Sequence, residues 1–345
     1  MITDATIKQR NIAIDIMKGL GMLLVIYDHC SIIDIEHKRM FMSFLMPMFF
    51  MVGGYLYKPN FNLWQDIKKS GKRLIFPYLV GVAIMLFFNH QLNLYGLYSL
   101  IGAAGLKHYW CKYLCDWPSV GAFWFFMAMF WCRVIFNLIF TRTERYKYPL
   151  LVLTCIVGYL LLRYVIRLPL GISEGLSMMM FYLIGHLFSV YSKNKATWTL
   201  RNQKICKIVF IFVLCIGLIL WIWSIKNSEV YSSGGIYEHH LINILGACCA
   251  TYIYYWICKL IGTYLNYTTK LLVFAGYGSL FILWIHKISR HCIFTGPTIL
   301  GFAPETITNT YIAINLLAQY AFCLLSLLLV KQSKHLSSFF GIYSH

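Results

Sequence analysis

Residues 12–33 read IAIDIMKGLGMLLVIYDHCSII, and this stretch decides the class of fold. It is long enough to cross the roughly 30 Å of a bilayer's hydrocarbon as a helix, which takes about 20 residues. It nevertheless carries Asp15, Lys18, Asp28 and His29. Ionisable groups at membrane depth cost several kcal/mol unless they face a partner or a water-filled cavity. The stretch therefore predicts a membrane-spanning helix with one polar face turned into the protein, and it marks these side chains as functional candidates.

The composition of the whole chain supports a polytopic membrane protein. Of its 345 residues, 59% are hydrophobic and only 12% are charged, whereas a soluble domain carries about 25% charged residues on its water-facing surface. This excludes a soluble enzyme, a disordered chain and a disulfide-rich secreted module. The net charge of +18 lies mostly in short gaps between apolar runs, so we expect no nucleic-acid partner. The 12 cysteines lie mostly within apolar runs and indicate no disulfide framework.

Apolar runs of membrane-spanning length recur along the chain and predict an all-α bundle of about ten transmembrane helices, forming a single domain over residues 1–345. Alternate gaps between the runs differ in charge: one set holds 19 of the 30 Lys and Arg residues and the opposite set holds 9. Cytoplasmic loops are the ones enriched in Lys and Arg, so both termini are predicted to be cytoplasmic. The runs cover residues 12–33, 40–57, 74–91, 119–140, 149–165, 173–192, 206–225, 240–262, 271–290 and 307–330.

Three ionisable residues of the first run fall on one helical stripe. Asp15 and Lys18 are three residues apart, so they share a face and can pair. His29 returns to within roughly 20° of the Lys18 direction, about 16 Å further along the axis, with Met22 between them on the same stripe. The pair could be a simple ion pair near the interface, and His29 could be structural. The alignment favours function: an imidazole in a dry bundle, reached along a cationic channel, is suited to take a proton from an alcohol.

A basic cluster occupies the gap after the second run. Residues 68–73 read KKSGKR, which places four cations within six residues shortly before the third run. Such a cluster could hold a phosphorylated ligand at the membrane surface through charge-assisted hydrogen bonds. Ordinary topogenic charge explains it as well.

Six motifs follow one another along the chain: Asp15-x-x-Lys18 followed by His29, FLMPMFFMVGGY at 44–55, KRLIFPY at 72–78, FWFF at 123–126, FYLIG at 181–185 and SLFILWIH at 279–286. In their order and spacing these motifs resemble the acyltransferase-3 family of integral-membrane O-acyltransferases, and the resemblance covers nearly the whole chain. Many members carry a Glu after the tryptophan that Trp124 matches; this chain has none there, which makes it similar to the fucose O-acetylase-like branch.

The resemblance implies transfer of an acyl group, usually acetyl, from cytoplasmic acetyl-CoA to a hydroxyl of a cell-surface carbohydrate or its lipid-linked precursor. It implies a bacterial inner membrane, contact with membrane lipid, and no metal. By position, His29 corresponds to the catalytic histidine and Lys18 to the basic residue before it. The remaining expected site residues are Asp15 beside Lys18, the phosphate-binding Lys69, Lys72 and Arg73, and the additional candidates His286 and Glu174.

Two other classes of protein fit the same composition. A transporter or flippase for a lipid-linked saccharide also has many spans and buried charges, but transporters show internal repeats and broken helices at matching places. The sequence shows neither. In a sensor or scaffold without chemistry, the stripe of Asp15, Lys18 and His29 would be structural only.

Overall fold

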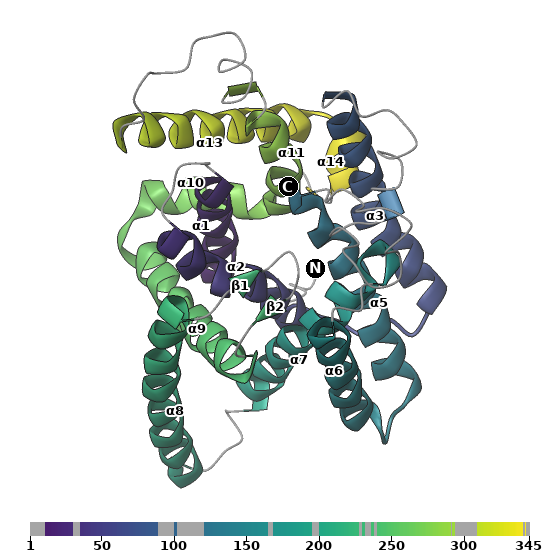
Figure 1. Ribbon diagram of the computed structural model, residues 1–345, viewed down its shortest axis with the longest axis vertical. Helices are drawn as coiled ribbons and strands as arrows, with labels where there is room; N and C mark the ends of the chain where they lie inside the picture. Colours follow the sequence, from purple (N-terminus) through teal and green to yellow (C-terminus); the bar gives the residue numbers. More distant parts are fainter. Residues whose placement is uncertain are drawn as a thin grey trace, which may run out of the picture.

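The computed structural model describes residues 11–29, 35–88, 100–101, 121–164, 168–194, 200–227, 230–231, 236–237, 240–290, 292–293, 309–340 and 342. These residues are almost entirely helical (Figure 1). Two short strands, β1 (Val230–Tyr231) and β2 (Ile236–Tyr237), pair antiparallel. The helices are α1 (Ile12–His29), α2 (Ile35–Tyr55), α3 (Leu63–Phe88), η1 (Gly121–Phe123), α5 (Trp124–Arg142), α6 (Lys147–Arg163), η2 (Pro169–Gly171), α7 (Ile172–Asn194), α8 (Leu200–Asn227), α9 (His240–Tyr264), α10 (Asn266–Tyr277), α11 (Ser279–Arg290), α13 (Asn309–Gln332) and α14 (Lys334–Phe340).

The fold is an all-α membrane bundle. Nine of the ten apolar runs each hold one described α-helix, and the run at 271–290 holds two, α10 and α11. Six helices of the described chain are long and apolar enough to cross a membrane, namely α3, α5, α7, α8, α9 and α13, and the bent pair α10 and α11 would make a seventh. The helices α1 and α2 carry too many charged residues to be counted with these six, and α6, with 17 residues, is too short. The count of about ten spans and the side of the termini therefore remain predictions.

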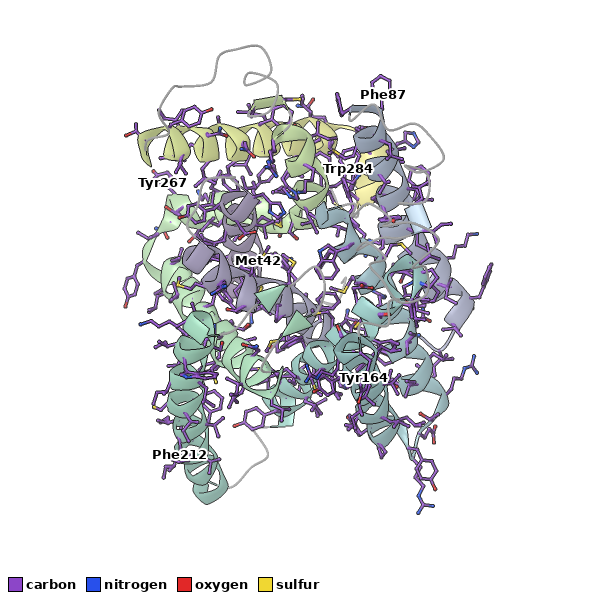
Figure 2. All side chains as sticks on the ribbon, in the orientation of Figure 1. Met42, Phe87, Tyr164, Phe212, Tyr267 and Trp284 are labelled. Carbon is purple, nitrogen blue, oxygen red and sulfur yellow. The ribbon has the colours of Figure 1, made fainter. Side chains whose placement is uncertain are left out.

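The outer surface of the bundle is apolar, as a lipid-facing surface must be. Only 11% of the apolar stretch of α8 is buried inside the protein, and α8 packs mainly on α9 at the periphery (Figure 1). Large side chains such as Phe212 on α8, which is 66% exposed, and Tyr267 on α10 project outward (Figure 2). In water such a surface would aggregate, so lipid is its natural solvent.

Glycines bring α2 and α7 into direct backbone contact. A Cβ at Gly54 would overlap the Tyr182 carbonyl, and a Cβ at Gly185 would overlap the Met51 carbonyl. Membrane helices gain little from the hydrophobic effect against each other, so small residues that allow close approach stabilise their packing. The motifs at 44–55 and 181–185, quoted above from the sequence, are therefore two halves of one helix contact.

Glycines also allow α10 to pack closely on α1, and another glycine lies at the break between α10 and α11. A Cβ at Gly19 would overlap the Leu272 carbonyl, and one at Gly276 would overlap the Asp15 carbonyl. At Gly278 the chain turns, and α11 leaves α10 at 86°. The prediction of an unbroken helix over 271–290 is therefore wrong. Its apolar composition is compatible with a straight span, and only the Gly-Tyr-Gly sequence at 276–278 signals the turn.

The basic cluster lies within a helix, not in a gap. We expected the third run to begin near residue 74, but α3 begins at Leu63, so residues 68–73 are helical. Asn62 caps the helix, since its side-chain oxygen accepts a hydrogen bond of 3.0 Å from the backbone N–H of Gln65. The earlier start follows from the amphipathic pattern of this segment: Asp66 and Ser70 lie on its buried face, and Lys68, Lys69 and Lys72 are exposed. The helical geometry then decides which cations can act together.

The contact between α2 and α7 can be tested at Gly54. We expect Gly54→Ala to lower the stability of the detergent-solubilised protein by about 1–3 kcal/mol, because the added methyl forces the two backbones apart. The midpoint of thermal unfolding measures this. Gly71→Ala is the matched control, since a Cβ there would meet only Ile75 Cδ1, at 3.8 Å. Equal midpoints for both variants would contradict the packing described.

Candidate active site

The acidic and basic residues at the start of α1 form an ion pair inside the bundle. Lys18 Nζ lies 2.8 Å from Asp15 Oδ1, and their side chains are 17% and 5% exposed. The backbone at Asp15 packs on Gly276 of α10, which keeps the carboxylate away from lipid. Lys18 extends from this contact toward a cavity on the other side.

That cavity, of about 610 Å³, is lined by six charged side chains, five of which are cationic. It lies between α1, α2, α3, α5, α7 and α11, and we call it the charged cavity. Its cations come from four separate segments of the chain, so only the tertiary fold assembles them. Its polar and charged lining residues are Lys18, Tyr57, Lys58, Asn60, Asp66, Lys69, Ser70, Arg73, Arg133, Tyr182 and Ser279.

The four bases of the cluster at 68–73 divide between two faces of α3. Lys69 and Arg73, four residues apart, line the charged cavity. Lys68 and Lys72 are not part of its lining, whereas Lys69, which is exposed as they are, is part of it. The structure thus brings Lys69 and Arg73 together with Lys18 and leaves Lys72 outside.

Two residues of the charged cavity were missed by the sequence analysis as site candidates. Arg133 Nη2 on α5 donates a hydrogen bond of 2.9 Å to Asp66 Oδ1 on α3. Arg133 lies within an apolar run, and an ionisable residue in such a run is itself a signal of function. Its partner is 67 residues away along the chain, so no local pattern could have connected the two.

His29 lies in contact with a second histidine. The rings of His29 and His286 are 5.0 Å apart between centroids and meet edge to face, at 73°. His29 Nδ1 lies 2.8 Å from the Val25 carbonyl oxygen, and His286 Nδ1 lies 2.7 Å from that of Leu283. A carbonyl oxygen only accepts, so each Nδ1 carries a proton, and in the neutral form of each ring the lone pair is on Nε2.

Charged groups surround this histidine pair. Asp28 Oδ2 is 3.8 Å from His29 Nδ1. Lys287 and Arg290 of α11 are within electrostatic reach of His29, and Lys287 is within reach of Asp28. The predicted candidates His29 and His286 therefore meet in one polar cluster at the ends of α1 and α11.

The charged cavity ends short of the histidines, along the same two helices. Met22 of α1 and Leu283 of α11 are in its lining. Met22 is about two helical turns before His29, and Leu283 is one turn before His286. The stripe from Lys18 through Met22 to His29 thus begins in the cavity and finishes at the histidine pair.

This geometry agrees with the comparison to known protein families. A family model described as an acyltransferase domain matches residues 11–332, nearly the whole chain. The chain belongs to the acyltransferase-3 family. No curated protein and no solved structure matches it.

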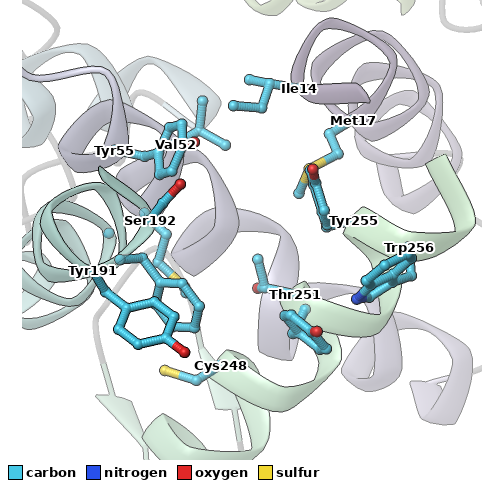
Figure 3. A pocket seen from close by; sticks show the side chains of 14 residues that line it. Ile14, Met17, Val52, Tyr55, Tyr191, Ser192, Cys248, Thr251, Tyr255 and Trp256 are labelled. Carbon is cyan, nitrogen blue, oxygen red and sulfur yellow. The ribbon is translucent and has the colours of Figure 1, made fainter. Parts of the chain in front are cut away.

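A second cavity of the acyltransferase, of about 310 Å³, is lined mainly by apolar and aromatic side chains (Figure 3). It lies between α1, α2, α7 and α9, with Tyr191, Tyr255 and Trp256 around it and Thr251 among its few polar groups. No Lys, Arg, Asp or Glu of the described residues lines it, and Val52 borders both cavities. It does not suit a polyanionic ligand.

Glu174, the remaining sequence candidate, lies apart from both cavities. It is buried in the first turn of α7 and lines neither of them. The next residue, Gly175, packs on Ala128 and Trp131 of α5. The structure therefore does not bring Glu174 to the charged cavity, and its assignment to the site stays a prediction.

The ion pair of α1 predicts a specific pattern of stability. We expect Lys18→Met or Asp15→Asn alone to destabilise the solubilised protein by about 1–3 kcal/mol, because each leaves a partly enclosed charge without its ion-pair partner. We expect the double variant to lose less than the sum of the two. Thermal unfolding midpoints of all four proteins measure the coupling, and strictly additive losses would show that the pair has no energetic role.

Proposed function

We propose that this acyltransferase moves an acetyl group from cytoplasmic acetyl-CoA to a hydroxyl of a cell-surface carbohydrate or its lipid-linked precursor. One observation carries the proposal: a cavity lined by Lys18, Lys69 and Arg73 leads along α1 toward the pair His29 and His286. Cations suit the phosphates of CoA, and a neutral imidazole suits a hydroxyl nucleophile. The stripe on α1 thus has cations for the phosphates around its Lys18 end and an imidazole for the acetyl transfer at its His29 end.

In the proposed mechanism His29 is the general base. Nδ1 of His29 is held by the Val25 carbonyl, so Nε2 accepts the proton of the acceptor hydroxyl as its oxygen attacks the thioester carbon. The resulting oxyanion is stabilised by positive charge, for which Lys287 is the candidate. When the intermediate collapses, the carbon–sulfur bond breaks and the CoA thiolate takes the proton from His29. Formation of a transient acyl-imidazole on His29 is the other route, and it uses the same atoms.

The proposal includes an orientation for the bundle. With about ten spans and both termini in the cytoplasm, the N-terminal end of α3, which carries Lys69 and Arg73, faces the cytoplasm, where acetyl-CoA is made. His29 ends α1 and lies toward the opposite side, where a carbohydrate acceptor would arrive. We place the protein in a bacterial inner membrane and in the fucose O-acetylase-like branch of the family, in both cases on the sequence resemblance.

A transporter of lipid-linked saccharides is the alternative, and the break between α10 and α11 favours it to a degree. Transporters pair such breaks between two halves of the chain. In the described ranges this is the one pair of helices that is bent in this way. The family match and the histidine pair support the enzyme.

The role of His29 is tested by its replacement. We expect His29→Ala to lower the rate of acetyl transfer at least about 10²-fold, the usual contribution of a general base. Radiolabelled acetyl-CoA, membranes containing the protein and a glycan extract of the host provide the assay. Binding of acetyl-CoA and the thermal midpoint should stay close to those of the wild type, because the phosphate-binding residues are untouched.

His186→Ala is the matched control for this experiment. His186 is also a buried helical histidine, but it packs among Phe136, Phe140 and Tyr57 and lines neither cavity. Its replacement should leave the rate of transfer per folded molecule unchanged. Full activity in His29→Ala would remove His29 from the mechanism.

The cations of α3 can be separated by charge reversal. We expect Lys69→Glu and Arg73→Glu each to raise KM for acetyl-CoA by about tenfold or more, because each loses a charge-assisted hydrogen bond to phosphate and adds a repulsion. Lys72→Glu reverses the same charge on the same helix at a position outside the cavity lining, so its KM should change less than about twofold. Equal effects at positions 69 and 72 would indicate a general surface charge effect in place of a binding site.

A further inference from the structure

One wall of the charged cavity carries a buried polar cluster that the phosphates of the donor do not explain. Asp66 and Ser70 of α3 are 1% and 3% exposed, and Arg133 of α5 joins them through its hydrogen bond to Asp66 Oδ1. All three residues line the cavity. We call them the Asp66 cluster.

Each member of the Asp66 cluster has a buried polar atom without a hydrogen-bond partner in the described chain. These atoms are Asp66 Oδ2, Ser70 Oγ and Arg133 Nε. An unsatisfied buried polar group costs about 1–3 kcal/mol, more when it is charged. Three such atoms on one cavity wall would lower the stability of the fold if their role were only structural. A bound ligand could supply the hydrogen bonds that they lack.

The charges of the cluster identify the part of a ligand that it fits. A carboxylate repels phosphate, so Asp66 is unsuited to a phosphate subsite. Its free oxygen needs an N–H or O–H donor, while Arg133 Nε offers a donor and Ser70 Oγ can act as either. A neutral group with both donors and acceptors meets these needs, and a nucleoside is such a group.

The spacing along α3 places this subsite beside the phosphate-binding cations. Asp66 and Arg73 are seven residues apart on one face, which is about 10 Å along the axis, and Lys69 and Ser70 lie between them. A nucleoside and its attached phosphates span a comparable length. A ligand whose phosphates contact Lys69 and Arg73 would therefore place its nucleoside within reach of Asp66.

The adjoining loop is fixed in a way that preorganises this wall. Asn137, four residues after Arg133 on α5, accepts hydrogen bonds from the Tyr57 hydroxyl (2.6 Å) and the Asn60 backbone N–H (3.1 Å), and its amide donates to the Asn60 carbonyl (2.9 Å). These bonds hold the segment with Lys58 against the cavity. A preformed wall lowers the entropic cost of binding.

We propose that Asp66, with Arg133 and Ser70, forms the nucleoside subsite of the acyl donor, in which Asp66 Oδ2 accepts a hydrogen bond from the adenine amine or the ribose hydroxyl. The subsite rests on the proposed function, since it takes the nucleotide of acetyl-CoA as its ligand. It makes Asp66 a determinant of donor specificity. Arg133 holds the carboxylate through Nη2 and offers Nε to the same ligand.

The test is competition against radiolabelled acetyl-CoA bound to the solubilised full-length protein. The competitors are the adenosine bisphosphate moiety of CoA, its inosine counterpart without the amine, and its deoxyribose counterpart without the free hydroxyl. We expect the wild type to bind one of the two counterparts about tenfold more weakly, the loss of one hydrogen bond to a charged group. That counterpart names the group that Asp66 contacts. The Asp66→Asn variant should bind the adenosine competitor and that counterpart with equal affinity.

Two sets of variants keep the result interpretable. Ser70→Ala, a small change that should leave the fold intact, is expected to weaken binding of the adenosine competitor about threefold. Glu144→Gln, in the exposed turn after α5, and Arg142→Gln, exposed at the end of α5, are matched controls that should bind as the wild type does.

The outcomes separate the subsite from the function on which it rests. If the wild type binds acetyl-CoA but does not discriminate, or if Asp66→Asn and Ser70→Ala bind and discriminate as the wild type does, the subsite is overturned while the donor assignment stands. If the wild type binds no acetyl-CoA at all, the donor assignment itself fails, and the subsite with it.

Discussion

The cost of placing charge inside a lipid-facing bundle is the constraint on which this structure depends. Asp15 and Lys18 are tolerated on α1 because they pair with each other and because α10 shields the carboxylate side, where Gly276 packs on the Asp15 backbone. Lys18 then has its ammonium group at the edge of a polar cavity. The other charges of that cavity either pair, as Asp66 and Arg133 do, or line its open volume.

The close helix contacts at glycines position the charged residues around the cavity. Close packing of α1 on α10 fixes the position of Lys18, and close packing of α2 on α7 fixes one wall of the charged cavity, where Val52 and Tyr182 lie. The turn at Gly278 directs α11 so that His286 reaches His29. A straight helix through 278 would carry His286 elsewhere, so the break is part of the construction of the histidine pair.

The two cavities of the acyltransferase differ in the ligands that they can hold. The charged cavity is lined by five cations and one carboxylate, whereas the cavity in Figure 3 has aromatic walls and, among the described residues, no Lys, Arg, Asp or Glu in its lining. Val52 lines both, so the two cavities adjoin at this side chain. This division of polarity within one bundle is consistent with a protein that handles a charged donor inside a membrane.

Much of the molecule follows from the sequence alone. Apolar length and low charge determine a helical membrane bundle, and helical periodicity places Asp15, Lys18 and His29 on one stripe, because these are properties of single segments. The tertiary structure decided the rest. In the folded protein Lys69 and Arg73 line the charged cavity and Lys72 does not, and Asp66 pairs with Arg133. His286 lies against His29, and the chain bends at Gly278. These depend on contacts between segments far apart in the chain, and hydropathy and periodicity, which describe one helix at a time, carry no information about which helices meet.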